Sequence, residues 1–236
     1  MGTAGWSIPR ASAQRFATPG THLERYARLF SGAEINSSFH RAHAPETYAK
    51  WAAATPPDFH FAVKCPRVIT HDLQLRRSRA PLARFIAETR GLARRRGPLL
   101  VQLPPSLAFD SRIAARFFTL LRTVHAGFVV CEPRHPTWGS AAANELLVRH
   151  RVARVAADPA PFSGAGEPGG WQGIVYYRLH GAPRKYWSRY DAAFIEGLAA
   201  RLSSVPRSVP RWCVFDNTAS GAAIENAWEL QTLVNR

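Results

Sequence analysis

Short apolar or β-branched runs alternate along the chain with longer segments in which apolar residues recur at helical spacing. This alternation is typical of βα units, in which each strand is followed by a crossover helix. Eight strands are predicted, and their spacing of roughly 25 to 40 residues leaves room for such helices. The predicted strands are Thr3–Ser7, Ala33–Phe39, Phe59–Cys65, Pro98–Pro104, Gly127–Pro133, Ala153–Asp158, Ile174–His180 and Arg211–Asn217.

Seven helices are predicted after these strands, and several begin with a capping Ser, Thr or Asp or with proline in the first turn. They are Thr21–Phe30, Pro45–Ala54, Pro81–Leu92, Ser111–Leu121, Ser140–His150, Asp191–Ser203 and Ala222–Val234. The sixth strand is followed instead by PAPFSGAGEPGGWQG, whose glycine and proline content is typical of a loop. We expect a sixth helix that is short or replaced by this loop, residues 159–173, which could act as a mobile lid.

The pattern predicts one α/β domain over residues 1–236, built as a single (β/α)8 TIM-type barrel with parallel strands. The length of 236 residues is close to the ~250 residues typical of such a barrel. No interdomain linker interrupts the pattern, and no run approaches the ~20 apolar residues that span a bilayer. We therefore expect a cytoplasmic protein without a membrane partner.

Polar residues cluster near the carboxyl ends of the predicted strands. Strands covered on both faces should be almost continuously apolar, so these polar residues require an explanation. In AEINSSF, alternation places Glu34, Asn36 and Ser38 on one face. The same parity points further residues into the barrel: Lys64, Gln102, Glu132, Arg134, Tyr176, Arg178, His180 and Asp216. Barrel enzymes carry their chemistry at this face, so the cluster favours a functional site over a purely structural ion network.

The three cysteines, Cys65, Cys131 and Cys213, each lie in an apolar β-like run without a nearby Cys or His partner. Their parity points them toward the helices rather than into the barrel. Burial in apolar surroundings disfavours the thiolate. We interpret all three as small buried hydrophobic residues rather than as nucleophiles or metal ligands.

The net charge is +15, and arginine supplies nearly all of it, since the chain contains only three lysines. Arginine suits phosphate and carboxylate groups, and a basic surface attracts nucleic acid without sequence preference. An anionic partner is therefore expected. The alternative is that the arginines only solvate helix faces.

Seven motifs in this order resemble the YecE-like family, also known as domain of unknown function 72: GTAGW, EINSSFH, FAVKCP, LLVQLPP, CEPRHPTW, YYRLHG and VFDNT. The resemblance covers essentially the whole chain and implies a TIM-type barrel with a pocket at the strand carboxyl ends. It implies no reaction. It marks as signature positions Trp6, Asn36, Lys64, Gln102, Glu132, Arg134, His135, Arg178, His180, Asp216 and Asn217.

Three kinds of chemistry remain open at such a site. A glycosidase would use two carboxyl groups, for which Glu132 and Asp216 are candidates. A divalent metal would gather Glu132, Asp158, His180 and Asp216, with Glu34 or His135 added; no metal-binding motif is present, so metal binding is open but not favoured, and the cofactor is unknown. A Schiff-base lyase would use Lys64, unless that lysine pairs with Glu34 or Glu132.

Anion binding is also indicated by the loops after the last two strands, because phosphate sites in barrels often lie there. HGAPRKYWSRY supplies Arg184, Lys185 and Arg189 with interleaved aromatic residues, and DNTASGAA supplies Thr218 and Ser220 at the start of the last helix.

The sequence predicts an enzyme, a hydrolase, lyase or isomerase, that uses acid/base chemistry on a phosphate- or carboxylate-bearing small molecule. The candidate catalytic residues are Glu132, His180, Asp216 and Lys64, with the pKa values of Glu132 and His180 tuned toward neutrality. The candidate substrate-binding residues are Trp6, Asn36, Gln102, Arg134, Arg178, Tyr190 and Asn217. The competing hypothesis is a noncatalytic protein that binds nucleic acid or nucleotides through its basic surface.

Overall fold

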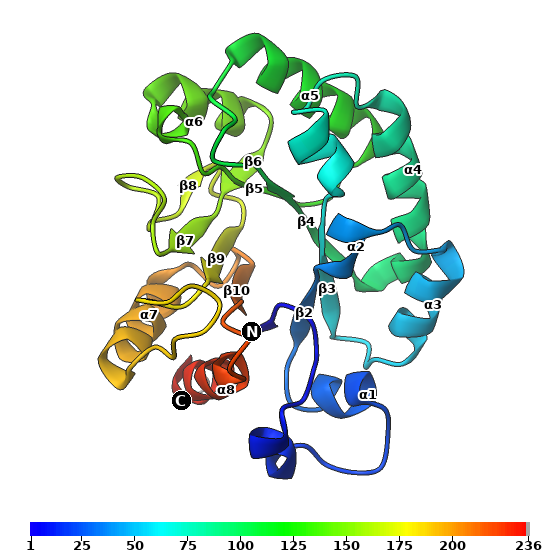
Figure 1. The fold of residues 1–236 in the computed structure, drawn as a ribbon, viewed down its shortest axis with the longest axis vertical. Coiled ribbons are helices and arrows are strands. Elements are labelled where there is room, and N and C mark those ends of the chain that lie inside the picture. The colour runs from blue at the N-terminus through cyan, green and yellow to red at the C-terminus, as the bar shows by residue number, and fades with distance from the viewer. Residues whose placement is uncertain (235–236) are drawn as a thin grey trace.

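The computed structural model describes residues 1–234, in which strands and helices alternate (Figure 1). The strands are β1 (Gly2–Thr3), β2 (Gly32–Ile35), β3 (His60–Lys64), β4 (Arg96–Gln102), β5 (Val129–Glu132), β6 (Val152–Arg154), β7 (Ala156–Asp158), β8 (Gly169–Gly170), β9 (Val175–Leu179) and β10 (Arg211–Phe215). The α-helices are α1 (His22–Ala27), α2 (Ser37–His40), α3 (Pro45–Ala53), α4 (Arg79–Thr89), α5 (Ser111–Val124), α6 (Ala141–Arg149), α7 (Ala192–Ser204) and α8 (Ala222–Val234). Short 3-10 or π-helical turns cover Arg10–Arg15, Val68–Asp72, Arg90–Arg95 and Pro136–Gly139.

The strands form two sheets, in the orders β1-β10-β9-β7 and β2-β3-β4-β5-β6-β8. All pairs are parallel except β6 with β8. The predicted α/β class with parallel strands is confirmed. The hydrogen-bonded ladders do not close into one eight-stranded sheet, so the predicted single barrel is not confirmed. The physical reason is that β1 has only two residues and the predicted sixth strand is interrupted at Val155, which leaves β6 and β7 in different sheets.

Backbone contacts at these two interruptions bring the sheets together. Ala4 forms an isolated parallel bridge with Glu34, and the Gly5 N–H donates to the Glu34 carbonyl at 2.8 Å. On the other side, the chain itself passes from one sheet to the other at Val155, whose N–H still donates to the Cys131 carbonyl of β5 at 2.8 Å, while the next residue, Ala156, pairs with Tyr177 of β9. The carboxyl ends of strands from both sheets therefore face the same region, and the helices lie around the outside of the strands (Figure 1).

The second predicted strand ends earlier than the sequence pattern indicates. β2 stops at Ile35, and Ser37–His40 forms the short helix α2 instead of continuing the strand to Phe39. The Ser38 hydroxyl donates to the carbonyls of Ile35 (3.0 Å) and Lys64 (2.7 Å). This hydroxyl competes with extended pairing and ties the turn after β2 to the end of β3.

Several helix starts follow the capping chemistry that the sequence indicates. Thr21 and Glu24 form a reciprocal capping box at α1, the Asp191 side chain accepts from the Phe194 N–H at α7, and Pro45 occupies the first turn of α3. The observed helices differ from the predicted ones by a few residues at their ends, where helix boundaries are least specified.

Residues 159–173 contain no helix in the structure, and within this loop Gly169–Gly170 forms β8. The loop is held by the Gly170 N–H, which donates to Asn144 at 2.8 Å, and by the Arg154 guanidinium, which donates to the Gly164 carbonyl at 2.9 Å. The helix is thus replaced by a loop, and its action as a lid stays a prediction.

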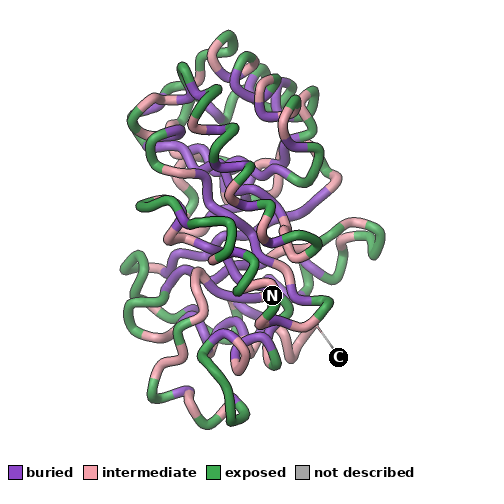
Figure 2. The backbone as a smooth tube through the Cα atoms, turned by 90° about the vertical axis from the view of Figure 1, so that its right-hand side faces the viewer, coloured by how far each residue is buried: buried purple, intermediate pink, exposed green. Residues whose placement is uncertain are grey.

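The apolar core has two parts, one on each side of the strands. The interior part gathers the residues that parity points inward, among them Ala62, Leu100, Val130, Tyr176 and Val214. The larger part lies between the strands and the helices and includes all three cysteines, which are fully buried free thiols, as the sequence predicts. Figure 2 shows this burial following the central strands, with exposed residues on the helices and loops.

Among residues 1–234, no helix is both long and apolar enough to cross a bilayer.

Candidate functional site

Arg178 lies at the centre of a buried ion network at the carboxyl ends of the strands. Its Nε and Nη2 donate to Glu34 on β2, with a shortest distance of 2.7 Å. Its Nη1 donates to Glu132 on β5 at 3.0 Å, and its Nη2 also donates to Asp216, just after β10, at 2.8 Å. The side chain of Arg178 is only 1% exposed. One guanidinium therefore joins three carboxyl groups from both sheets.

The His180 ring bridges two of these acids. Nε2 lies 3.1 Å from Glu132 Oε1, and Nδ1 lies 3.2 Å from Asp216 Oδ2. A carboxylate only accepts hydrogen bonds, so both ring nitrogens carry protons and the ring is an imidazolium. Burial opposes this charge, but Glu132 and Asp216 outweigh it and raise the pKa of His180 above its ordinary value. The raised pKa agrees with the geometry.

The pKa of Glu132 moves in the opposite direction from the tuning toward neutrality that the sequence suggests. Burial would raise it, but Arg178, His180 and Arg134 hold it well below its ordinary value. The pKa of Asp216 is also lowered, because Arg178 and His180 overcome the effect of burial. Both side chains are ionised at neutral pH, so neither is a resting-state proton donor.

Two further side chains complete the network. The Arg134 guanidinium donates to Glu132 Oε1 at 3.0 Å, and the Tyr176 hydroxyl donates to Glu34 Oε2 at 2.8 Å. The three carboxyl groups are thus matched by three cations, Arg178, Arg134 and the His180 imidazolium. Lys64 is left outside this balance.

A polar cavity of about 350 Å³ opens above this network. Its lining comes from both sheets and from the turns after β2, β3 and β9: Asn36, Phe39, His40, Lys64, Arg67, His71, Gln102, Arg134, Tyr186 and Asp216. Larger hollows lie elsewhere on the protein, of about 550 and 880 Å³, but the ionisable network reaches only this one. We therefore take it as the candidate site.

Lys64 ends β3 and points into the cavity. It is 9% exposed, and no described residue forms a hydrogen bond or ion pair with its ammonium group. Its Nζ lies over the Phe39 ring, 4.2 Å from the centroid. Burial, followed by the charge of Arg178, lowers the pKa of Lys64 to about 8, although Glu34, Glu132 and Asp216 act in the opposite direction. The sequence leaves open that Lys64 pairs with Glu34 or Glu132. In the structure these two acids pair with Arg178 instead.

Two amide side chains also face the cavity with unused hydrogen-bonding capacity. Gln102, at the end of β4, is 5% exposed, and its side chain makes no hydrogen bond to another described residue. The Oδ1 of Asn36 is buried and has no partner among the described atoms. Unpaired buried polar groups are costly, so they suit a ligand that supplies the missing partners.

The structure divides the sequence-predicted site residues into three groups. Lys64, Asp216, Asn36, Gln102 and Arg134 line the cavity. Glu132, Arg178 and His180 lie in the network beside it and do not line it. The remaining three, Trp6, Tyr190 and Asn217, are used in packing or hydrogen bonding elsewhere.

Trp6 packs edge-on against Trp51 and Phe61 rather than against the cavity. The Tyr190 hydroxyl donates to Asp158 Oδ1 at 2.7 Å and accepts from the Gly181 N–H, which fixes the loop after β9. The Asn217 amide donates to Ser188 and Asn226. These three side chains thus pack against or hold neighbouring parts of the protein. A direct contact between any of them and a substrate stays a prediction.

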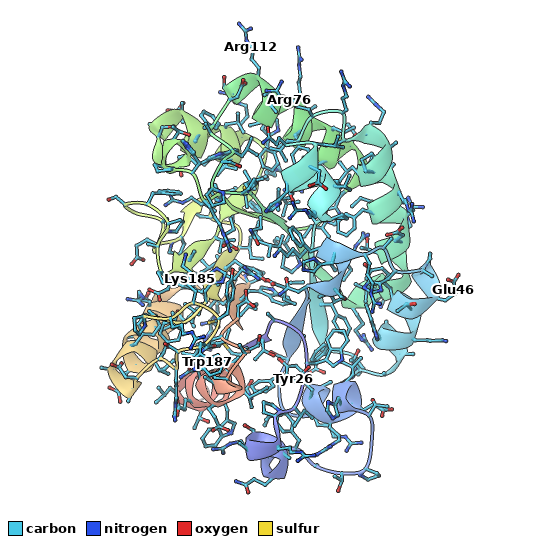
Figure 3. The ribbon with its side chains drawn as sticks, in the orientation of Figure 1. Tyr26, Glu46, Arg76, Arg112, Lys185 and Trp187 are labelled. Carbon is cyan, nitrogen blue, oxygen red and sulfur yellow. The ribbon has the colours of Figure 1, made fainter. Side chains whose placement is uncertain are left out.

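Arg67 and His71 line the cavity although neither is among the candidate site residues taken from the sequence. Both belong to the turn after β3, directly beyond the FAVKCP motif, and that proximity is the signal that could have identified them. Burial and nearby positive charges lower the pKa of His71 to about 4, so its ring is neutral. Lys185 and Trp187, on the loop after β9, lie on the outside (Figure 3).

Within residues 1–234, no group of three or more His, Cys, Asp or Glu side chains has an arrangement that could hold a metal ion. The acids that the sequence offers for this purpose are instead hydrogen-bonded to Arg178, His180 and Tyr190.

Comparisons with known proteins place the chain among proteins without an assigned activity. The model of the family described as "Protein of unknown function DUF72" matches residues 1–236. The chain is 30% identical over 165 residues to the UPF0759 protein YecE of Escherichia coli (strain K12), a stretch covering 67% of this chain and 60% of that relative.

Two solved structures share the fold. A DUF72 family protein from Thermotoga maritima MSB8 superposes with a TM-score of 0.83 at 22% identity, covering 99% of this chain and 98% of that one. A DUF72 family protein from Enterococcus faecalis V583 gives 0.82 at 18% identity, covering 100% and 94%. At these identities, the similarity establishes the fold alone.

Proposed function

Because the chain belongs to the DUF72 family, whose function is unknown, we infer its role from the site and propose an enzyme that acts on an anionic small molecule by acid/base chemistry. The observation that carries the proposal is that the side chains of Lys64 and Gln102 are buried without hydrogen-bonding partners. Both are more than nine-tenths buried, both line one cavity, and neither has a side-chain hydrogen-bonding partner among the described residues. A ligand with negatively charged oxygens would pair with both.

The charge around the cavity supports an anionic ligand. The carboxyl groups below it are already hydrogen-bonded to Arg178, Arg134 and His180. The protonated Lys64 is the surplus charge, and Arg134 and Arg67 also reach the cavity wall. A phosphate or carboxylate group would neutralise this surplus without displacing the network.

The proton transfers are assigned to the one lysine and the one carboxylate, among the described residues, that line the cavity. We propose Lys64 as the group that gains and loses a proton near neutral pH, and Asp216 as the base. Glu132 and His180, which do not line the cavity, act behind Asp216 by holding its orientation and charge.

We also propose that the two sheets work as a single (β/α)8 barrel. The bridge between Ala4, next to β1, and Glu34 on β2 supports this, as does the direct passage of the chain from β6 into β7 at Val155, because each joins one sheet to the other. A cytoplasmic location, expected from the sequence, remains part of the proposal.

The test is thermal unfolding in sodium phosphate or sodium citrate, compared with sodium chloride at equal ionic strength. A ligand at 100 times its Kd stabilises the folded state by about 2.7 kcal/mol, which raises Tm by roughly 5–10 °C for a protein of this size. Lys64→Met should abolish the rise, while Lys185→Met, on the exposed loop, should retain it. An equal rise in both variants, or none in the wild type, would remove the basis of the proposal.

A second candidate function, nucleic-acid binding, is favoured by a basic groove of about 880 Å³ between residues 75–79 and α5. Arg76, Arg77, Arg79 and Arg116 line it, and all four are exposed. Figure 3 shows Arg76 and the neighbouring Arg112 pointing outward at the same end of the molecule.

This candidate is tested by the anisotropy of a labelled duplex DNA as the salt concentration is varied. Replacing Arg76, Arg77 and Arg116 together by Ser should reduce the slope of log Kd against log salt by roughly 2–3, since each phosphate contact contributes about 0.9. An unchanged slope would exclude this groove as the binding surface.

A further inference from the structure

We propose that Lys64 is a Schiff-base lysine, whose amine condenses with the aldehyde or ketone carbon of a substrate that also carries an anionic group held by Arg134. This inference rests on the proposed function and narrows its substrate class to anionic carbonyl compounds.

The geometry isolates one amine at the site. Lys64 is the only lysine lining the cavity, and Lys50 on α3 and Lys185 on the loop after β9 are exposed. The acids whose charge acts on Lys64 are occupied: Glu34, Glu132 and Asp216 accept from Arg178, at 2.7, 3.0 and 2.8 Å. A buried lysine is ordinarily paired with a carboxylate, but here the carboxylates pair with Arg178 instead of with Lys64.

The Phe39 ring, 4.2 Å from Nζ, covers the amine on one side. Gln102 and Arg134 line the same cavity and can bind oxygens of the same substrate. The site therefore combines one amine without an ionic partner, an apolar wall and anion-binding groups within about 350 Å³, which suits a small molecule.

The protonation state of Lys64 favours attack at neutral pH. With its pKa lowered to about 8, about a quarter of the amine is unprotonated at pH 7.5, compared with about 0.1% at the ordinary value of 10.5. The charged or titratable groups that line the cavity with it or act on its charge are Glu34, His40, Arg67, His71, Glu132, Arg134, Arg178, Tyr186 and Asp216.

The condensation balances without a further reactant. The nitrogen lone pair of neutral Lys64 attacks the carbonyl carbon, the C=O π pair moves to oxygen, and a proton passes from nitrogen to that oxygen to give a carbinolamine. The hydroxyl then takes the second proton of the nitrogen and leaves as water, as the nitrogen pair forms the C=N bond. Asp216, which is ionised and lines the cavity, carries the proton between nitrogen and oxygen.

The resulting imine, once protonated, would draw electrons from a neighbouring C–H or C–C bond of the substrate. Cleavage of either bond is lyase or isomerase chemistry. The network of Glu132, Asp216 and Arg178 would hold the electrostatic environment of the imine constant during this step.

The experiment traps the imine chemically in the wild-type protein. The protein is incubated with glyceraldehyde 3-phosphate or with glyceraldehyde, in the presence of sodium cyanoborohydride, and digested for peptide mass spectrometry. With three lysines in the chain, each modified peptide identifies its residue. We expect Lys64 to be modified at least tenfold faster than Lys50 or Lys185, faster by the phosphorylated aldehyde than by the neutral one, and more slowly when inorganic phosphate is added.

A charge-preserving variant separates this inference from the proposed function. Lys64→Arg should lose the modification at position 64 while keeping the Tm rise in phosphate, and Lys185→Arg should keep both. Modification of Lys64 no faster than that of the two exposed lysines overturns the Schiff-base inference, even if phosphate still stabilises the protein. Failure of phosphate both to stabilise the protein and to slow the modification overturns the anion site itself.

Discussion

Replacing Arg178 by Met should destabilise the protein strongly at neutral pH and much less at mildly acidic pH. The substitution keeps an unbranched apolar chain in place of the aliphatic part of the arginine and removes the guanidinium that joins Glu34, Glu132 and Asp216. Because Arg178 is 1% exposed, water cannot replace the lost hydrogen bonds without opening the core. The variant leaves the buried Glu34 without a cation, whereas Glu132 and Asp216 keep the imidazolium of His180.

The magnitude follows from the two states open to a stranded carboxylate. Leaving it charged costs about 3–5 kcal/mol, the usual result of breaking a buried ion pair by removing one partner. Protonating a glutamate whose ordinary pKa is 4.5 costs about 4 kcal/mol at pH 7.5 and about 1.4 kcal/mol at pH 5.5, at 1.36 kcal/mol per pH unit. The loss should therefore be at least about 3 kcal/mol at pH 7.5 and shrink by about 2–3 kcal/mol at pH 5.5.

The measurement is the free energy of unfolding from urea denaturation at both pH values. Arg207→Met serves as the control, because Arg207 is exposed and makes no side-chain hydrogen bond to a described residue. Adding Glu34→Gln to Arg178→Met should recover part of the loss, since it removes one stranded carboxyl group. A loss below 1 kcal/mol at pH 7.5, or one of equal size at pH 5.5, would show that Arg178 does not hold the network in this way.

Three further predictions test the network, the backbone and the cysteines. The lowered pKa values of Glu132 and Asp216 stabilise the fold above their ordinary values of 4.5 and 3.8 and lose this effect as pH falls, and the lowered pKa of His71 costs stability as pH falls below 6.5. The raised pKa of His180 gives stability that is fully present below 6.5, and Lys64 is protonated in both states there, so neither opposes this trend; urea denaturation should show stability rising from pH 3 to about pH 6.5, and a maximum below pH 5 would contradict the assignment. Gly91→Ala should lower the free energy of unfolding by about 1–3 kcal/mol, because its Cβ would lie 2.1 Å from a backbone carbonyl oxygen. Gly197→Ala, in α7 with open space around it, should raise the free energy of unfolding by about 0.5–1 kcal/mol. Equal effects of the two variants in thermal denaturation would refute the packing argument. The three buried cysteines should not react with a thiol reagent such as DTNB until the protein is unfolded, and rapid reaction of any of them in the native protein would contradict their burial.

The sequence identified five of the ten residues that line the cavity, because strand parity is a local property. Lys64 and Gln102 end β3 and β4 with the parity that points them inward, and both line the cavity. Arg67 and His71 were not selected because His71 belongs to a π-helical turn and Arg67 directly precedes it, and strand alternation carries no information there. Tyr190 lies in a loop whose basic and aromatic residues suit ligand binding, but its hydroxyl is used in hydrogen bonds with Asp158 and Gly181.

By itself the sequence determined the α/β class, the order of strands and helices, the loop in place of a sixth helix and the inward face of each strand, because these follow from periodicity and capping within short segments. Only the tertiary structure decided which charges meet. Arg178 could have paired with any of several acids, and its selection of Glu34, Glu132 and Asp216 depends on distances between residues up to 144 positions apart. That choice left Lys64 without an ionic partner, and it is the reason that the polar cluster expected from the sequence becomes a specific site.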